Sequence, residues 1–273
     1  MSKTKRTPIG IISMSYWSKK LEDAIPLAAD TGYDSMEIWT EHLWKFQERP
    51  SHVGSIIASN KMRATVHCPV MDTNITSPNL GIREESVRQF LQAVEMSHDM
   101  GAELLVIHPG HLYSLNETLD DFWGLLLQSL ERIVKHAQKY GVALAIENMD
   151  VQKEFEVVKR SEHIRRITKH FEAEKLGVVL DTTHLSSVPQ IIEYIQNTDC
   201  IVHTHLSDAR ITPRGSVDTH LPLGEGELDF QQVFDVLLPN YHGIVSFETF
   251  VPPAKAQTLI TQREWLDSLL NSR

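Results

Sequence analysis

Short apolar segments alternate with longer amphipathic segments along the whole chain. The short segments are continuously apolar or rich in valine and isoleucine, which is typical of parallel strands buried on both faces. They predict eight strands, at residues 9–13, 34–39, 64–68, 103–108, 142–147, 177–181, 201–205 and 244–248.

The longer segments carry apolar residues three and four positions apart, which is the period of an amphipathic helix. Such stripes run through 83–101 and 120–141, and both segments end at a glycine, Gly101 and Gly141, which favours helix termination. Further helices are predicted at about 20–30, 51–60, 161–173, 187–197, 229–238 and 256–271.

Eight strands that alternate with eight helices predict an α/β fold of the (β/α)8 TIM-barrel type. An open, doubly wound sheet is the alternative, but no GxGxxG follows the first strand and no strand has the character of an edge. We therefore predict a single barrel domain over 8–273, preceded by a solvated tail at 1–7.

Composition narrows the class of protein. The 273 residues are 41% hydrophobic and 23% charged, which excludes disordered and collagen-like proteins. A net charge of −10 gives nucleic acid and anionic lipid no long-range attraction. Cys68 and Cys200 are isolated from each other and from any metal-binding spacing, so we expect both to be reduced. Neither a secretory leader nor a long apolar run is evident, so we expect a cytoplasmic protein without a membrane partner. The sequence does not predict the oligomeric state, and an oligomer is possible.

Side chains that bind metals close seven of the eight predicted strands. The active site of a TIM barrel lies at the carboxyl ends of its strands. A single residue of this kind is more often a capping or hydrogen-bonding residue than a metal ligand. Several carboxylates that converge on one rim, however, raise one another's pKa unless a cation lies among them. Carboxylates with imidazoles suit Zn²⁺, Mn²⁺ or Co²⁺, and carboxylates with water suit Mg²⁺, so we predict a divalent metal site. The seven residues are Glu37, His67, His108, Glu147, Asp181, His205 and Glu248.

Two loops add candidates of the same kind. His184 lies one turn beyond Asp181, and Asp218 and His220 lie two residues apart, so they would face one way in an extended loop. A turn residue is the alternative for Asp218, and a surface histidine is the alternative for His220. Each of the two is a possible additional ligand or substrate-binding residue.

Other polar and aromatic residues are harder to assign. His203 faces the same side as His205 but one layer deeper, so we interpret it as a supporting or core residue. The glycines of Leu223–Gly226 fit either a phosphate-binding turn or a plain tight turn. Five aromatic residues are predicted in loops at the barrel mouth, namely Trp17, Trp39, Trp44, Tyr113 and Phe250. The histidines expected to have no role in the site are His42, His52, His98, His111, His136, His163, His170 and His242.

Together, these motifs resemble the xylose isomerase-like TIM-barrel superfamily, which includes sugar phosphate isomerases and epimerases and the endonuclease IV family. The resemblance extends from the first strand to Phe250. It is carried by YDSMEIW, VHCPV, MGAELLVIHPG, GVALAIEN, GVVLDTTH, HTHLSDA, DTHLPLGEGELDF and VSFETF.

The resemblance implies a metal set of Glu147, Asp181, His205 and Glu248, in which the two glutamates also move the proton. His184 would hold a substrate oxygen. The implied protein is a divalent-metal-dependent isomerase or epimerase of a small sugar, sugar phosphate or cyclitol, acting through a metal-stabilised enediolate.

The endonuclease IV branch is the alternative, and it implies an apurinic/apyrimidinic-site phosphodiesterase with three zinc ions and a DNA partner. All nine of its ligand types have a counterpart here. Glu37 in MEIW, the absence of cysteine from GVVLDTTH and the composition of CPVMDTNIT depart from that branch, whereas Asp218 favours it. A lyase, a dehydratase and a non-catalytic binding barrel are further alternatives. The nine counterparts are His67, His108, Glu147, Asp181, His184, His205, Asp218, His220 and Glu248.

Overall fold

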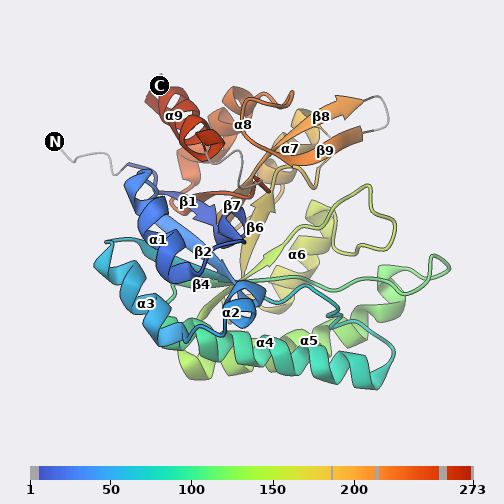
Figure 1. Cartoon of the computed structure of the whole chain (residues 1–273). Coiled ribbons are helices and arrows are strands. Elements are labelled where there is room, and N and C mark those ends of the chain that lie inside the picture. The colour runs from blue at the N-terminus through green and yellow to red at the C-terminus, as the bar shows by residue number, and fades with distance from the viewer. Residues whose placement is uncertain (1–5, 186, 213–214, 252–256, 272–273) are drawn as a thin grey trace.

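Eight parallel strands close into a barrel in a computed structural model that describes residues 6–185, 187–212, 215–251 and 257–271 (Figure 1). Their order around the barrel is β1-β10-β7-β6-β5-β4-β3-β2, which confirms the predicted TIM barrel. The strands are β1 (Ile9–Ile12), β2 (Ser35–Trp39), β3 (Arg63–His67), β4 (Leu104–Ile107), β5 (Ala143–Glu147), β6 (Gly177–Asp181), β7 (Ile201–Leu206) and β10 (Ile244–Phe247).

Helices surround the barrel, and each predicted helix is present. Both long helices end where the sequence predicts, because Gly101 and Gly141 adopt left-handed φ angles of 71° and 68°. The predicted helices are α1 (Leu21–Asp30), α3 (Pro50–Ser59), α4 (Leu80–Met100), α5 (Leu119–Tyr140), α6 (Ser161–His170), α7 (Val188–Gln196), α8 (Phe230–Leu237) and α9 (Gln257–Asn271).

One α-helix, one hairpin of two strands and two short 3-10 helices were not predicted. Helix α2 (Thr40–Phe46) follows β2 directly, so Trp44 lies in a helix and not in a loop as predicted. Trp39 ends β2, as the predicted strand at 34–39 implies, although it was also counted among the loop aromatic residues. Strands β8 (Asp208–Thr212) and β9 (Gly215–Leu221) pair into an antiparallel hairpin that stands out from the barrel, where we had expected a loop (Figure 1). Two short 3-10 helices, η1 (Ser13–Tyr16) and η2 (Leu238–Asn240), complete the described elements.

Apolar side chains fill the molecule in two separate layers. The larger core lies between the strands and the helices. A smaller cluster joins Leu104 and Val106 of β4 to Ala145 of β5 and Val179 of β6. Because side chains alternate along a strand, these residues share the inward face with the strand-end residues and form an apolar layer beneath them.

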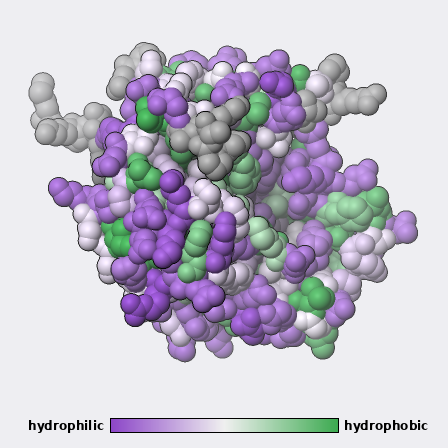
Figure 2. All heavy atoms as spheres, viewed as in Figure 1, coloured by the Kyte–Doolittle hydropathy of each residue, from purple (hydrophilic) through white to green (hydrophobic). Residues whose placement is uncertain are grey.

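The surface is mostly polar. Figure 2 shows hydrophilic side chains over most of one face, with hydrophobic ones in small groups. None of the helices in the described part of the chain has the length and apolar character needed to cross a bilayer. Residues 1–5 of the predicted tail lie outside the described residues, and Arg6 pairs with Asp34 at 2.5 Å.

Replacing Ile133 by alanine tests the outer core. Ile133 is fully buried on α5, so Ile133→Ala should lower the free energy of unfolding by about 2–5 kcal/mol, because it leaves a cavity. The matched control is Leu80→Ala, at a side chain that is 61% exposed; its effect should stay within about 0.5 kcal/mol. Chemical denaturation measures both, and equal losses would contradict the assignment of the core.

Candidate metal centre

Four neighbouring strands of the barrel wall bring Glu147, Asp181, His205 and Glu248 together. Glu147, Asp181 and His205 lie on β5, β6 and β7, and Glu248 directly follows β10. One ligand atom from each lies within 4.8 Å of the others, and all four residues are buried. We call this group the four-residue cluster. It has the composition that the family resemblance implies.

The turn after β6 orients the carboxylate of Asp181. Its Oδ1 accepts hydrogen bonds from the backbone N–H groups of Thr183 (2.7 Å) and His184 (3.0 Å) and from the Thr183 hydroxyl (3.0 Å). The side chain of Asn148 accepts from the Asp181 backbone N–H (2.8 Å) and donates to its carbonyl (3.1 Å). Since Oδ1 already accepts three hydrogen bonds, Oδ2 is the oxygen that remains available as a ligand in the cluster. Sequence analysis did not identify Asn148, and its position directly after Glu147 was the only available signal.

The remaining ligand atoms also lack hydrogen-bond partners. Nδ1 of His205 lies 2.8 Å from Glu248 Oε2 and 3.4 Å from Glu147 Oε1, but neither contact has hydrogen-bond geometry. Buried polar atoms normally have partners. A divalent cation bound by carboxylates and an imidazole would satisfy them, so these residues fit such an ion. The unpartnered atoms are Glu147 Oε2, Asp181 Oδ2, His205 Nδ1 and Glu248 Oε2.

The charges in the cluster favour a cation. Burial raises the pKa of Asp181, in spite of the neighbouring His184. Burial disfavours a protonated His205, yet Glu248, Glu37 and Glu147 raise the pKa of His205 well above its usual value. The carboxylates therefore create a strongly negative potential in a region with little exposure to water, where electrostatic interactions are strong.

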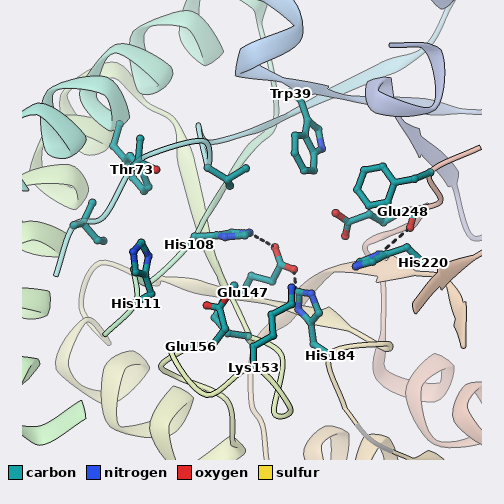
Figure 3. A pocket seen from close by; sticks show the side chains of 16 residues that line it. Trp39, Thr73, His108, His111, Glu147, Lys153, Glu156, His184, His220 and Glu248 are labelled. Carbon is teal, nitrogen blue, oxygen red and sulfur yellow. Dashed lines mark hydrogen bonds and ion pairs between the residues drawn. The ribbon is translucent and has the colours of Figure 1, made fainter. Parts of the chain in front are cut away.

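His67 and His108 form a second group with Glu147. Their Nε2 atoms lie 3.6 Å and 3.2 Å from Glu147 Oε2, and the three residues also satisfy the spacing of a metal site. Nδ1 of His67 contacts the Cys68 carbonyl oxygen at 2.8 Å, which leaves its Nε2 facing Glu147. Figure 3 shows His108 and His184 directed at the Glu147 carboxylate. Glu147 therefore lies between two candidate metal positions.

The structure brings His184 and His220 to the rim of this site but not Asp218. The rings of the two histidines lie 5.7 Å apart, and Nδ1 of His220 lies 3.2 Å from the Glu248 carbonyl oxygen. The Asp218 side chain is 58% exposed and pairs with Arg210 at 2.9 Å. Asp218 and His220 both have left-handed φ angles, 47° and 60°, so the alternation of an extended segment does not apply to them.

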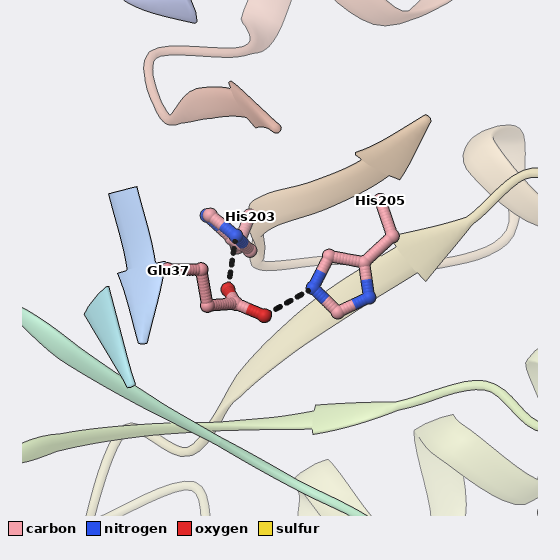
Figure 4. A group of neighbouring side chains, drawn as sticks. All are labelled: Glu37, His203 and His205. Carbon is pink, nitrogen blue, oxygen red and sulfur yellow. Dashed lines mark hydrogen bonds and ion pairs between the residues drawn. The ribbon is translucent and has the colours of Figure 1, made fainter. Parts of the chain in front are cut away.

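Glu37 lies in the barrel interior and does not line the pocket. Its two carboxylate oxygens lie 3.0 Å from His205 Nε2 and 2.8 Å from His203 Nε2 (Figure 4). Burial raises the pKa of Glu37, but His205 and His203 outweigh it and hold the pKa well below its usual value. His203 is thus placed against Glu37, one layer below His205.

A pocket of about 350 Å³ opens above the cluster. Trp39 stacks on His67 with ring centroids 4.4 Å apart, and the Phe250 ring meets Trp39 edge-on at 6.2 Å, so both form an aromatic wall. Three polar lining residues were not predicted, because they come from the loops that follow β4 and β5 and not from the strand ends themselves. One of them, His111, was expected to have no role in the site but lines the pocket. The three residues are His111, Lys153 and Glu156.

The glycines of Leu223–Gly226 form a turn around a buried carboxylate. Oδ2 of Asp208 accepts hydrogen bonds from the N–H groups of Gly224 and Gly226, both at 3.0 Å. Oδ1 accepts from the N–H group of Leu228 at 3.0 Å. These amides are therefore already engaged within the protein, which supports the tight-turn interpretation over a phosphate-binding loop.

Comparison with known proteins identifies one family and several distant relatives. Residues 25–269 match the family model described as xylose isomerase-like TIM barrel. An uncharacterized protein of Methanocaldococcus jannaschii is 26% identical over 250 residues, 88% of this chain and 82% of its own. The fructoselysine 3-epimerase of Shigella flexneri is 23% identical over 254 residues, 88% of each chain. A probable endonuclease 4 of Aquifex aeolicus is 22% identical over 200 residues, 68% of this chain and 70% of its own.

Solved structures show the same fold. A D-tagatose 3-epimerase-like protein superimposes with a TM-score of 0.82 at 23% identity and covers 97% of both chains. The IolI protein, solved with a bound zinc atom, has a TM-score of 0.82 at 18% identity and covers 97% of this chain and 98% of its own. Both identities are low, so these matches establish the architecture.

Two aspartates that the sequence ranked as candidates should now behave differently. Asp181→Asn weakens the negative charge of the four-residue cluster and should remove most of the bound metal. Asp218→Asn, at an exposed residue paired with Arg210, should leave metal content unchanged. Elemental analysis after loading with Zn²⁺ or Mn²⁺ measures both variants. Loss of metal in the Asp218 variant alone would overturn this assignment.

Proposed function

Because this chain belongs to the xylose isomerase-like TIM-barrel family, we propose that it is a divalent-metal-dependent isomerase or epimerase of a small sugar, sugar phosphate or cyclitol. The observation that carries the proposal is the four-residue cluster, whose unpartnered ligand atoms converge at the floor of a pocket. The likeness to sugar epimerases in fold and sequence supports it.

Glu147 and Glu248 are the proposed acid–base pair. A divalent ion held by these residues would supply Lewis-acid stabilisation of the negative charge that develops when the proton leaves. Both glutamates line the pocket, and they enter it from strands separated by β6 and β7. One can therefore remove the proton next to a substrate carbonyl while the other returns a proton from a different direction.

Histidines support this pair: His205 and His108 keep Glu147 ionised, and His184 is placed to bind the substrate. Burial raises the pKa of Glu147, but His205 and His108 hold it well below its usual value, so the carboxylate is ionised and able to accept a proton. His184 contacts the Asn148 carbonyl oxygen through Nδ1 at 2.7 Å. Its Nε2 is then left to hold a substrate oxygen.

The pocket suits a small polar molecule with one apolar face. Its volume of about 350 Å³ is at the small end of ligand pockets. Trp39 and Phe250 offer ring faces to the C–H groups of a sugar, and Lys153, Glu156 and His111 offer partners for hydroxyl or phosphate groups. The pocket thereby accommodates the substrate classes that we propose.

An endonuclease IV-type phosphodiesterase is the second candidate. The group of His67, His108 and Glu147 favours it, because that group adds a second metal position, and so do the endonuclease 4 relatives. Two observations oppose it. Asp218 lies away from the site, and Lys153 is the only lysine or arginine that lines the pocket in the described part of the chain, whereas DNA binding draws on many such contacts.

Solvent exchange tests the proposed chemistry even while the product is unidentified. The metal-loaded protein should incorporate deuterium from D2O next to the carbonyl of at least one member of a panel of ketoses and ketose phosphates. Glu147→Gln and Glu248→Gln should slow this exchange by about 10²–10⁴-fold, because each removes a proton-transfer group. Proton NMR follows the signal.

The control for this experiment is Glu41→Gln, which makes the same change at a buried glutamate that belongs neither to the pocket lining nor to a candidate metal group among the described residues. Its exchange rate should stay within about tenfold of the wild-type rate, since it removes no proton-transfer group. Full exchange in Glu248→Gln would refute the acid–base assignment.

The nuclease alternative has its own test. The zinc-loaded protein should leave a duplex with one abasic site intact, because the pocket offers few cationic partners for the phosphate backbone. Denaturing gel electrophoresis reads the result. Nicking that disappears in His67→Ala would replace the isomerase proposal with the phosphodiesterase.

A further inference from the structure

We propose that Glu37 and His203 are positioning residues that hold His205 as a metal ligand through Nδ1. This inference rests on the proposed metal centre, and it concerns residues that lie below that centre and do not contact the pocket. Three buried side chains from two strands carry it, and Figure 4 shows them together.

Glu37 joins two histidines of one strand from across the barrel. It lies on β2, whereas His203 and His205 lie two residues apart on β7, on the same face. Its Oε1 lies 3.0 Å from His205 Nε2, with hydrogen-bond geometry, and its Oε2 lies 2.8 Å from His203 Nε2. All three side chains are at most 1% exposed, so water does not compete for these contacts.

The contact with Glu37 determines which nitrogen of His205 is free. An ionised carboxylate only accepts hydrogen bonds, so Nε2 must donate its proton to Glu37. In a neutral imidazole the other nitrogen then carries the lone pair. That nitrogen, Nδ1, lies 2.8 Å from Glu248 Oε2 and 3.4 Å from Glu147 Oε1. Glu37 therefore both selects the tautomer of His205 and fixes its ring plane, as carboxylates do behind metal-bound histidines.

His203 is needed because Glu37 is a fully buried carboxylate. Such a charge is stable only when both oxygens have partners. His205 donates to Oε1, and the Thr65 hydroxyl donates to Oε2 at 3.2 Å. His203 Nε2 lies 2.8 Å from Oε2 as an ion-pair contact without hydrogen-bond geometry. Within the described residues, His203 belongs to no candidate metal group except the one with Glu37 and His205. Its contact with Glu37 thus orients the carboxylate that in turn orients His205.

Cobalt binding provides the test, because it reports on the centre without a substrate. The metal-free protein is titrated with Co²⁺ while visible absorption is recorded, for the wild type and for Glu37→Gln. A glutamine has no charge, and its NH2 group would replace one of the two oxygens that face His205 and His203, so it cannot accept at both positions. The variant should bind Co²⁺ about 10–100-fold more weakly, with an altered absorption spectrum.

A matched control separates positioning from folding. Glu41 is also a buried glutamate, 6% exposed, and its Oε1 accepts from the N–H groups of Val70 (2.7 Å) and Met71 (3.0 Å). Glu41→Gln makes the same chemical change without touching a ligand histidine. Its Co²⁺ affinity should match the wild type even if its metal-free thermal midpoint falls as far as that of Glu37→Gln.

Two variants of His203 test the same idea independently should Glu37→Gln fail to fold. His203→Gln keeps an N–H donor near the position of Nε2, and its Co²⁺ affinity should stay within about threefold of wild type. His203→Leu removes the donor and should bind about tenfold more weakly, at the low end of supporting-residue effects. Equal affinities in the two variants would overturn the role of His203.

The outcomes distinguish this inference from the proposed function. A wild-type protein that binds no Co²⁺ would refute the metal centre itself. If the wild type binds Co²⁺ and Glu37→Gln matches it in affinity and spectrum, Glu37 does not position His205. Should the wild type bind one more ion than Glu37→Gln, then Glu37, His203 and His205 are themselves a metal site and the positioning role is wrong.

Discussion

The crowding of buried acidic groups at one end of the barrel is the constraint on which the rest of this structure depends. Glu147, Asp181 and Glu248 share a small region with His205, and each is almost completely enclosed. Charges removed from water are stable only beside opposite charge. The pKa of His205 reflects this demand, since Glu248, Glu37 and Glu147 outweigh its burial and raise the pKa well above its usual value.

The barrel meets this demand with layers of different chemistry along its axis. An apolar layer that includes Val106 and Val179 fills the interior. The carboxylate of Glu37 then connects to His205 at 3.0 Å, and the four-residue cluster and its pocket follow. Because the strands are hydrogen-bonded to their neighbours on both sides, the ligands have little freedom to move. A rigid site of this kind loses little entropy when it binds an ion.

The same arrangement is compatible with both of the functions considered above. The four-residue cluster suits either, and Glu147 links it to the neighbouring His67 and His108. The difference between the two lies outside the barrel wall. In this chain the β8–β9 hairpin carries Asp218 to the surface, and the pocket has an aromatic wall of Trp39 and Phe250.

The sequence alone was sufficient to predict the barrel strands, most of the helices and the strand-end residues that meet at the barrel mouth. Each of these depends on a local pattern, because strand alternation and helical period are set by backbone geometry, and a closed barrel then brings all strand ends to one rim. Glu147, Asp181, His205 and Glu248 were therefore among the seven residues grouped from their places at the strand ends, and the family resemblance implied these four as the metal set. Only the tertiary structure revealed the β8–β9 hairpin, the position of Asp218 away from the site, and the nitrogen of His205 that faces the cluster. It also revealed the lining residues His111, Lys153 and Glu156. These features depend on left-handed φ angles and on contacts between residues far apart in the chain, such as Glu37 with His205, which leave no periodic trace in the sequence.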